Sequence, residues 1–144
     1  MNTVADIMTA AVVTIEPQSS VATAIRLMRQ GQMRRLPVVE DGALIGIVTS
    51  GDLRRITGLS SILNDPSQDN FLWRHIPVEN VMSRNPTTLD AETPICEAAR
   101  LLVEQKIGGV PIVDHGKLVG IVTTSDLLAT LMVDEECAQF ASVA

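Results

Sequence analysis

A threonine and an aspartate recur at the same spacing in two similar segments of this 144-residue chain. The first segment is Gly46-Ile47-Val48-Thr49-Ser50-Gly51-Asp52, and its copy is Gly120-Ile121-Val122-Thr123-Thr124-Ser125-Asp126. An apolar run that ends at a hydroxyl side chain is typical of a strand that leads into a helix. We expect the threonine hydroxyl at this junction, with free backbone N–H groups beside it, to offer an anion site.

The aspartate adds a second chemistry. A carboxylate repels a phosphate, but it can accept hydrogen bonds from both hydroxyls of a vicinal diol, as acidic residues do for ribose in dinucleotide sites. Phosphate near Thr49 and ribose near Asp52 together indicate a nucleotide. A plainer interpretation is that the threonines only cap helices and the aspartates only favour the helix dipole. The duplicated pattern fits both interpretations.

The two segments lie within a longer internal repeat. Residues 4–56 align with residues 78–130 without a gap, and 16 of the 53 positions are identical. The chain is therefore predicted to hold one repeat at 4–56, a connection at 57–77, a second repeat at 78–130 and a tail at 131–144.

Each repeat begins with a short extended piece, at 13–15 or 87–89, followed by a helix. Helical spacing of apolar residues is present in both copies, at Val21, Ala24, Ile25 and Met28 and at Ile95, Ala98, Ala99 and Leu102. We expect Ser19 and Thr93 to cap these helices, which places Pro94 at the first helical position.

Two β-branched runs follow the helix in each copy. A carboxylate-X-Gly turn at 40–42, and again at 114–116, predicts hairpins with strands 36–39 and 44–49 and strands 110–113 and 118–123. A final helix begins near Thr49 or Thr123. The expected fold class is α/β, in detail α+β. Two β-α-β-β-α repeats, each too small to be stable alone, pack sheet to sheet with pseudo-two-fold symmetry.

Composition excludes several other classes of protein. Hydrophobic residues make up 46% of the chain, which is too many for a disordered protein. The run at 43–48 is far shorter than the roughly 20 residues that span a membrane. The N-terminal residues lack a signal-peptide pattern, and two cysteines form no disulfide framework, so a cytoplasmic location is expected. The net charge of −6 disfavours binding to DNA.

The duplicated unit resembles a pair of CBS domains, the cystathionine-β-synthase-type repeats that form a Bateman module. Asp6-Ile7-Met8-Thr9, Leu36-Pro37-Val38-Val39 and the Gly46–Asp52 segment carry the resemblance, which covers about 106 of the 144 residues. The resemblance implies clefts between the two repeats that bind an adenosyl ligand such as AMP, ADP, ATP or S-adenosylmethionine.

The resemblance also implies which residues contact that ligand. It implies that the Thr and Asp of each T-x-x-D segment contact the phosphate and the ribose. It also implies that the first short strand and the residues around the hairpin proline contact the base. In this chain these positions are Thr14, Ile15, Arg35, Leu36, Pro37, Thr49 and Asp52, with Thr88, Leu89, Gly109, Val110, Pro111, Thr123 and Asp126 in the second copy.

The two copies differ in positive charge near the motif. The first has Arg34, Arg35, Arg54 and Arg55 where the second has Gly108, Gly109, Leu128 and Ala129. We therefore expect the first site to bind a phosphorylated adenosine more tightly than the second. The alternative is that these arginines are solvated or pair with nearby acids, worth about 0–1 kcal/mol each.

The remaining reactive residue types indicate no catalysis and no metal site. His115 is expected to be exposed in a hairpin turn, His75 to lie in the connection, and Cys96 to lie in the core. Cys137 follows an acidic run that disfavours a thiolate. No required cofactor is expected, and the chain is not expected to be an enzyme.

The favoured function is a sensor that binds an adenosyl ligand and acts in trans on an effector protein. Phe71 and Trp73 hold two of the three aromatic rings of the chain, which favours a homodimer contact there, although they could only cover the junction between repeats. A ligand-free association module and, less favoured, a small nucleotide-acting enzyme stay as alternatives.

Overall fold

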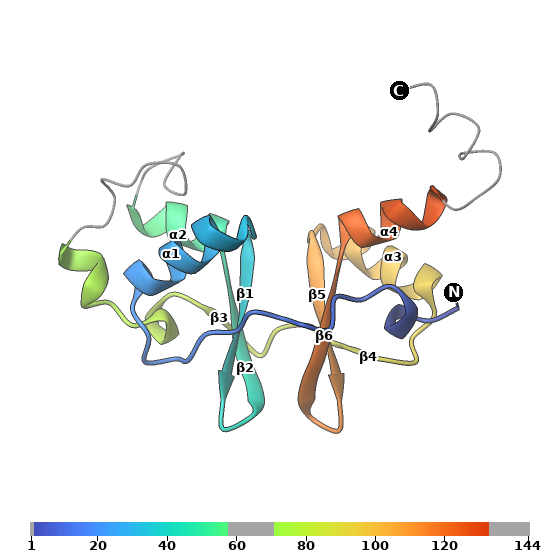
Figure 1. Ribbon diagram of the computed structural model, residues 1–144, viewed down its shortest axis with the longest axis horizontal. Helices are drawn as coiled ribbons and strands as arrows, with labels where there is room; N and C mark the ends of the chain where they lie inside the picture. Colours follow the sequence, from blue (N-terminus) through green and yellow to red (C-terminus); the bar gives the residue numbers. More distant parts are fainter. Residues whose placement is uncertain (1, 58–70, 133–144) are drawn as a thin grey trace. The chain divides into compact units, whose positions relative to one another are not determined.

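The computed structural model describes residues 2–57 and 71–132, and these belong to two compact units. The first unit is Val13–Pro86, and the second combines Met1–Val12 with Thr87–Ala144 (Figure 1). Each unit mixes strands with helices, so the α+β class expected from the sequence is confirmed. No helix in the described ranges is long and apolar enough to cross a membrane.

The first unit is built on a hairpin. Its helices and strands are α1 (Val21–Gly31), β1 (Arg35–Glu40), β2 (Ala43–Thr49), α2 (Ser50–Thr57) and β3 (Ser83–Arg84), with short 3-10 turns at Phe71–Arg74 and Val78–Asn80. Strands β1 and β2 are antiparallel, and β3 adds to the other edge of β2. The expected strand at 13–15 is reduced to a parallel bridge between Ile15 and Val38.

The second unit repeats this plan. It contains a 3-10 turn at Val4–Asp6, then β4 (Leu89–Asp90), α3 (Ile95–Gln105), β5 (Gly109–Asp114), β6 (Lys117–Thr123) and α4 (Thr124–Leu131). Strands β5 and β6 form the antiparallel hairpin, and β4 runs parallel to β5. Thr9 bridges Ile121 of β6, in the place that β3 takes beside β2.

The two hairpin turns have the backbone that their sequences predict. Asp41 and Gly42 have φ values of 53° and 83°, and His115 and Gly116 have 51° and 81°. Two successive positive φ angles match the right-handed twist of the flanking strands, which is why such turns favour Gly at the second position. Each hairpin is therefore closed by a two-residue turn, one residue shorter than the turn we expected from the sequence.

Helix caps differ by one residue from those expected. Ser20, not Ser19, precedes α1, and its hydroxyl accepts a hydrogen bond of 3.1 Å from the Thr23 amide. Pro94, not Thr93, is the cap residue of α3. Proline has no side-chain acceptor, so α3 begins without a side-chain cap.

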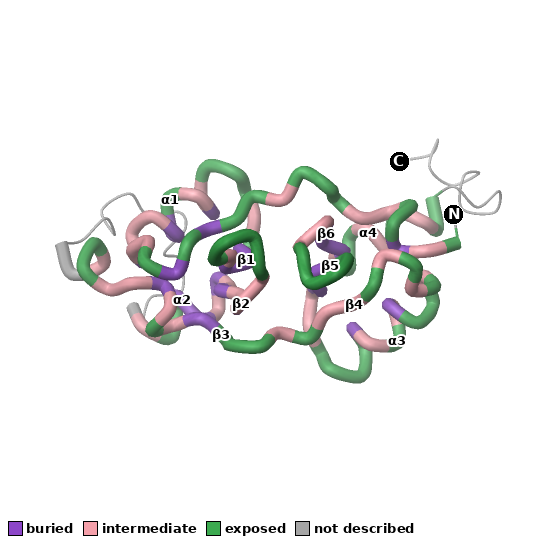
Figure 2. The backbone as a smooth tube through the Cα atoms, turned by 90° about the horizontal axis from the view of Figure 1, so that it is seen from below, coloured by how far each residue is buried: buried purple, intermediate pink, exposed green. Residues whose placement is uncertain are grey.

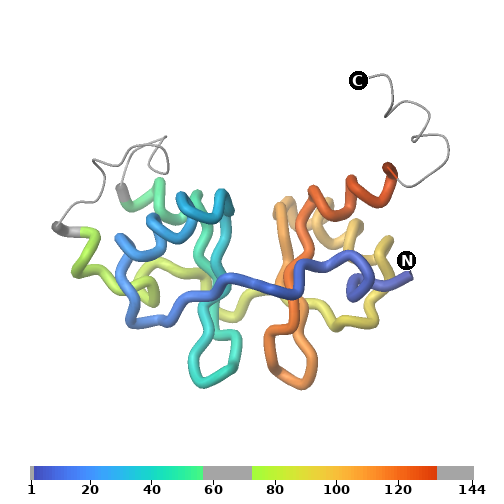
Figure 3. The backbone as a smooth tube through the Cα atoms, viewed as in Figure 1, coloured from blue at the N-terminus to red at the C-terminus, as the bar shows by residue number. Residues whose placement is uncertain are grey.

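The lead segment of each sequence repeat packs in the unit of the other repeat. In the second unit, the Val4 amide donates to the Thr93 carbonyl at 2.9 Å. In the first unit, the Val78 amide donates to the Ser19 carbonyl at 2.8 Å. Figure 3 shows the blue N-terminal residues beside the orange and red segments that complete the second unit. The first residues of each sequence repeat therefore belong to the compact unit that holds the rest of the other repeat.

Each unit has its own apolar core, and Figure 2 shows buried positions in purple in both units. The predicted α1 stripe is confirmed, since Val21, Ala24, Ile25 and Met28 are all buried with Leu36, Val48 and Leu53. In the second unit Ala98 and Leu102 of α3 pack with Val4, Val110 and Val122. The expectation that Cys96 is a core residue is wrong. Cys96 is exposed, because it lies off the helix face that Ala98 and Leu102 bury.

Candidate functional site

The junction between β2 and α2 brings the first-copy motif together with the start of β1. Strand register places Arg35 opposite Thr49. The amide of Ser50, the first residue of α2, donates to the Arg34 carbonyl at 2.8 Å. Both Arg34 and Arg35 are therefore held beside the first turn of α2, although about 15 residues separate them from it in the sequence.

Thr49 and Asp52 satisfy each other across this turn. The Thr49 amide donates to Asp52 Oδ2 at 2.8 Å, and the Asp52 amide donates to Thr49 Oγ1 at 3.2 Å. This reciprocal pattern is a capping box, which uses two N–H groups that a helix start otherwise leaves unpaired. The plainer interpretation of the motif, a helix cap, is thus realised in the structure.

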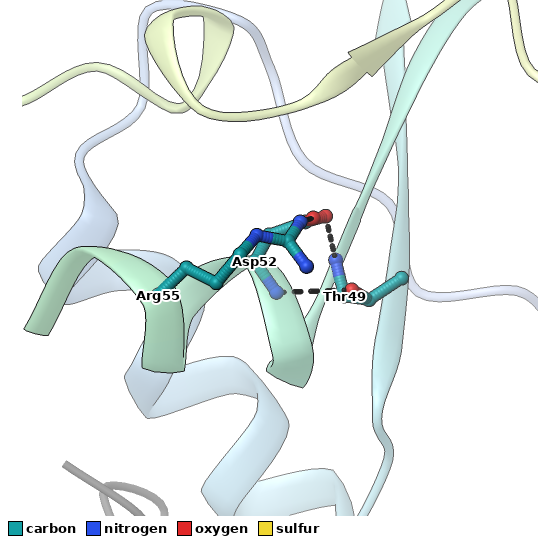
Figure 4. Close-up of polar contacts among 3 residues, drawn as sticks. All are labelled: Thr49, Asp52 and Arg55. Atoms are coloured by element: carbon teal, nitrogen blue, oxygen red, sulfur yellow. Dashed lines mark hydrogen bonds and ion pairs between the residues drawn. The ribbon is translucent and has the colours of Figure 1, made fainter. Parts of the chain in front are cut away.

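Arg55 adds a charge to the same carboxylate. Its Nη2 atom contacts Asp52 Oδ1, and Figure 4 shows the side chain reaching back along α2 to that oxygen. The Asp52 side chain is only 6% exposed, whereas that of Arg55 is 73% exposed. A nearly buried carboxylate is therefore covered by a guanidinium that faces solvent.

The second copy repeats the capping box without the cation. The Thr123 amide donates to Asp126 Oδ2 at 2.8 Å, and the Asp126 amide donates to Thr123 Oγ1 at 3.3 Å. The Thr123 hydroxyl also donates to Asp126 Oδ2 at 3.1 Å. Ala129 stands where the first copy has Arg55. The two junctions thus share a backbone and differ in their charged partners.

The expectation of free backbone amides at these junctions is wrong for most of the first turn. The amides of Thr49, Ser50 and Asp52 all donate to acceptors of the protein. The second copy agrees, since the Thr124 amide donates to the Gly108 carbonyl at 3.0 Å. The capping box and the neighbouring strand use these donors. An anion at either junction would therefore depend more on side chains than the sequence suggested.

The positions expected to contact a base lie along the outer side of each hairpin. The Ile15 amide donates to the Pro37 carbonyl at 3.0 Å, which holds the short segment with Thr14 against β1. In the second unit Leu89 pairs with Ile112 of β5. Side chains of Ile15, Leu36 and Val110 are buried in the two cores. Any contact from these three residues to a ligand would come mainly from their backbone.

The remaining expected positions have unequal exposure. Thr14 is exposed, Thr88 and Leu89 are half-buried, and Pro37, Gly109 and Pro111 are buried. The structure brings Arg35, Thr49 and Asp52 together at the β2–α2 junction, and Gly109, Thr123 and Asp126 at the β6–α4 junction.

Arg35 is half-buried at the start of β1. Burial lowers the pKa of its guanidinium from the usual value, and the neighbouring charge of Arg34 lowers it further. Both causes disfavour the charged form of Arg35, the first through loss of water and the second through repulsion between like charges. An anion bound between these two side chains would oppose both effects.

Sequence reasoning missed the part played by Ser50. This residue is buried, its amide holds the Arg34 carbonyl, and its hydroxyl lies 3.4 Å from Nη1 of Arg54. The sequence held one signal for this role, because the equivalent position, Thr124, is also a hydroxyl residue. In the structure the Thr124 amide makes the same type of contact, to the Gly108 carbonyl.

A cavity of about 500 Å³ lies at the opposite end of the first hairpin. It is lined by Thr14, Glu16, Pro17, Gln18, Val39, Glu40, Asp41 and Gly42. Three carboxylates in this lining disfavour a phosphate there. The cavity shares only Thr14 with the positions expected to bind a ligand.

The remaining candidate reactive groups are dispersed. His115 is exposed as expected, and its Nδ1 atom lies 2.7 Å from Asp114 Oδ1. Within residues 2–57 and 71–132, no three His, Cys, Asp or Glu side chains gather as metal ligands would. Trp73 packs partly buried against the first core, while Cys137 and the side chain of Phe71 lie outside the described part of the chain.

Comparison with known proteins finds the same duplicated unit. The family model described as the CBS domain matches twice, at residues 4–57 and 78–133. A CBS domain-containing protein of Dictyostelium discoideum is 36% identical over 132 residues, which cover 90% of each chain.

Two similar solved structures contain adenosyl compounds. CBSX2 in complex with AMP has a TM-score of 0.76 and 29% identity, over 92% of this chain and 97% of that one. The CBS domain pair of protein MJ0100, in complex with 5′-methylthioadenosine and S-adenosyl-L-methionine, has a TM-score of 0.74 and 27% identity, over 90% and 94% of the two chains.

Proposed function

The chain belongs to the CBS domain family, and on that basis we propose that it is a regulatory module that binds an adenosyl ligand. The ligand is a nucleotide such as AMP, ADP or ATP, or S-adenosylmethionine. One observation carries the proposal: both copies hold a threonine and an aspartate in the same geometry at a strand–helix junction. Similar CBS pairs have been solved with AMP and with S-adenosyl-L-methionine.

In the first copy the capping box leaves both Asp52 and Thr49 able to take part in binding. In the second copy the Thr123 hydroxyl already donates to Asp126 Oδ2, and only Asp126 keeps that capacity. A carboxylate oxygen has more than one lone pair, so Asp52 Oδ2 can accept from the Thr49 amide and from a ribose hydroxyl. The Thr49 hydroxyl accepts from the Asp52 amide and still has its own hydrogen to donate to a phosphate oxygen. The capping and ligand-binding interpretations of these residues are therefore compatible.

The base is proposed to lie against Thr14, Ile15, Arg35, Leu36 and Pro37 in the first copy, and against Thr88, Leu89, Gly109, Val110 and Pro111 in the second. Ile15 and Leu36 bury their side chains, and the Ile15 amide already donates to the Pro37 carbonyl. Recognition is therefore proposed to depend largely on backbone C=O groups, which have a second lone pair, and on aliphatic surface. Such a site needs no aromatic ring, which suits a chain with no Tyr and one Trp.

We further propose that binding biases the arrangement of the module and that an effector protein responds in trans. The proposal includes a cytoplasmic location, no reaction of the ligand and no metal. Residues 4–56 and 78–130 are proposed as the two CBS repeats. Incubation with ATP or S-adenosylmethionine should return both compounds unchanged, and release of a product would favour the enzyme alternative.

A homodimer is also proposed, and the second unit offers an apolar surface for it. Leu128, Leu131 and Met132 at the end of α4, and Val103 on α3, are exposed. Exposed apolar side chains are typical of association surfaces when they lie together, and Leu128, Leu131 and Met132 follow one another at the end of α4. Trp73, which the sequence favoured for this contact, packs partly buried against the core of its own unit and stays a candidate for the contact. Elution as a monomer at micromolar concentration would contradict the homodimer.

Thermal unfolding in the presence of adenosyl compounds tests the main proposal. AMP, ADP, ATP and S-adenosylmethionine should be compared with GMP and with buffer. A ligand at 100 times its dissociation constant stabilises the folded state by about 2.7 kcal/mol, which raises the midpoint by several degrees. The absence of a shift with every adenosyl compound would favour the ligand-free association module.

A further inference from the structure

Resting on the proposed function, we propose that Arg55 selects phosphorylated ligands at the first site by changing partners. In the free protein it contacts the Asp52 carboxylate. When a ribose diol binds to Asp52, the guanidinium moves to the phosphate of the same ligand. Arg55 is thus a specificity-determining residue that responds to diol and phosphate together.

The occupancy of Asp52 is the first step of the argument. Oδ2 already accepts from the Thr49 amide at 2.8 Å, and Oδ1 contacts Arg55. The carboxylate is only 6% exposed and Arg55 occupies Oδ1, so little of it is open to a diol while that contact holds. A diol must therefore displace or share the place of Arg55 on Oδ1.

The exchange favours a ligand that carries an anion. Two neutral hydroxyls are weaker partners for a carboxylate than a guanidinium is, because a charged donor makes a stronger hydrogen bond. An unphosphorylated nucleoside would displace Arg55 and give it no new partner. A phosphorylated nucleoside supplies that partner, and a guanidinium matches two phosphate oxygens at once.

The surroundings of Arg55 also favour an anion. The amides of Thr49, Ser50 and Asp52 are engaged, so a phosphate would depend more on side chains than on the helix start. Arg34 and Arg35 lie beside the same turn, through the Ser50 amide and the strand register. The Arg55 side chain is 73% exposed, so it can move without disturbing the core.

The second copy provides an internal comparison. Asp126 has the same capping box, but Ala129 replaces Arg55, and Gly108 and Gly109 replace the two strand arginines. Among residues 2–57 and 71–132, no Lys, Arg or His forms an ion pair with Asp126. A diol can approach this carboxylate without displacing a cation, and the site gains little from a phosphate.

The experiment compares AMP with adenosine, which differ only in the phosphate, by titration of the ¹⁵N-labelled full chain. The backbone amide signals of Asp52 and Asp126 report the two sites separately. In the natural chain the Asp52 signal should show tighter binding of AMP than of adenosine by about tenfold, and the Asp126 signal should show about equal binding.

Two variants move the selectivity in opposite directions. Arg55→Ala should weaken AMP at the first site by about tenfold and leave adenosine unchanged or slightly tighter, because Asp52 is then uncovered. Ala129→Arg should make the second site prefer AMP. Both positions are exposed and helical, and both Ala and Arg are good helix formers, so the fold is retained.

The outcomes separate this inference from the proposed function. If no adenosyl compound among AMP, ADP, ATP, adenosine and S-adenosylmethionine shifts either amide signal, the proposed function itself fails at these sites. If AMP binds at the first site but Arg55→Ala lowers AMP and adenosine affinity equally, or changes neither, the exchange of partners is refuted while ligand binding stands. A loss confined to AMP supports it.

Discussion

The backbone of Gly46 in β2 lies against the Met82 side chain. A Cβ atom added at Gly46 would stand 2.5 Å from Met82 Sδ and 2.9 Å from the Ser83 carbonyl oxygen. Gly120 in β6 meets Met8 in the same manner. The glycine of each G-I-V-T segment therefore provides room for the methionine of the lead segment that completes its unit.

Replacing this glycine should weaken the first unit. Gly46→Ala puts a methyl group into space that a flexible thioether and a backbone carbonyl already fill. We expect the free energy of unfolding to fall by about 1–3 kcal/mol, the usual cost of overpacking. Chemical denaturation of the variant and the natural chain measures the difference.

Gly51→Ala serves as the matched control for that substitution. A Cβ at Gly51 meets the nearest atoms at 3.6 and 3.8 Å, which are ordinary contacts. Because Gly51 lies in α2, alanine there should raise stability by about 0.5–1 kcal/mol. Equal losses from Gly46→Ala and Gly51→Ala would contradict the overpacking argument.

The capping box at α4 should contribute measurably to stability. Thr123→Ala removes the hydroxyl that accepts from the Asp126 amide. We expect a loss of about 1 kcal/mol, as for other N-cap replacements. Thr123→Ser keeps the oxygen and should retain most of the stability. Thermal unfolding compares the three chains, and a serine variant as unstable as the alanine variant would argue against a capping role.

The Asp6 carboxylate should make the second unit sensitive to acid. Hydrogen bonds from the Thr3 amide, and next from the Asn2 amide, lower the pKa of Asp6 below its usual 3.8. A folded-state pKa below the unfolded value stabilises the fold fully above pH 3.8, and this stabilisation disappears as the pH falls through the lower value.

Urea unfolding between pH 6 and about pH 2, in the natural chain and in Asp6→Asn, tests this expectation. The natural chain should be the more stable at pH 6, and the difference should shrink towards the lowest pH. A difference between the two chains that stays constant over the whole range would mean that the charge of Asp6 is not involved.

The second hairpin turn can be improved. His115 has a φ of 51° and precedes Gly116, so it occupies a position that asparagine adopts more readily than histidine. His115→Asn should raise the free energy of unfolding by a few tenths of a kcal/mol, and His115→Val should lower it, because a β-branched residue resists positive φ. Differential scanning calorimetry measures the stability of both variants. A His115→Val chain more stable than the His115→Asn chain would contradict the turn argument.

Much of the local structure could be read from the sequence. The α1 stripe of Val21, Ala24, Ile25 and Met28, the turns at Gly42 and Gly116, and the strand–helix junctions were all predicted. These features depend on residues within a few positions of one another, through helical spacing, positive φ and capping. The exposure of Cys96 was mispredicted, because an apolar-looking residue beside an amphipathic stripe can still lie off the buried face.

The sequence by itself determined the two repeats, their elements and the Thr and Asp of each junction. Only the tertiary structure decided which lead segment completes which hairpin, since Met8 and Met82 are alike and either glycine could receive either methionine. The tertiary structure also brings the Arg55 guanidinium into contact with the Asp52 carboxylate and gives the junction amides their acceptors. The physical reason is that local patterns fix elements, whereas the pairing of similar surfaces depends on how the whole chain packs.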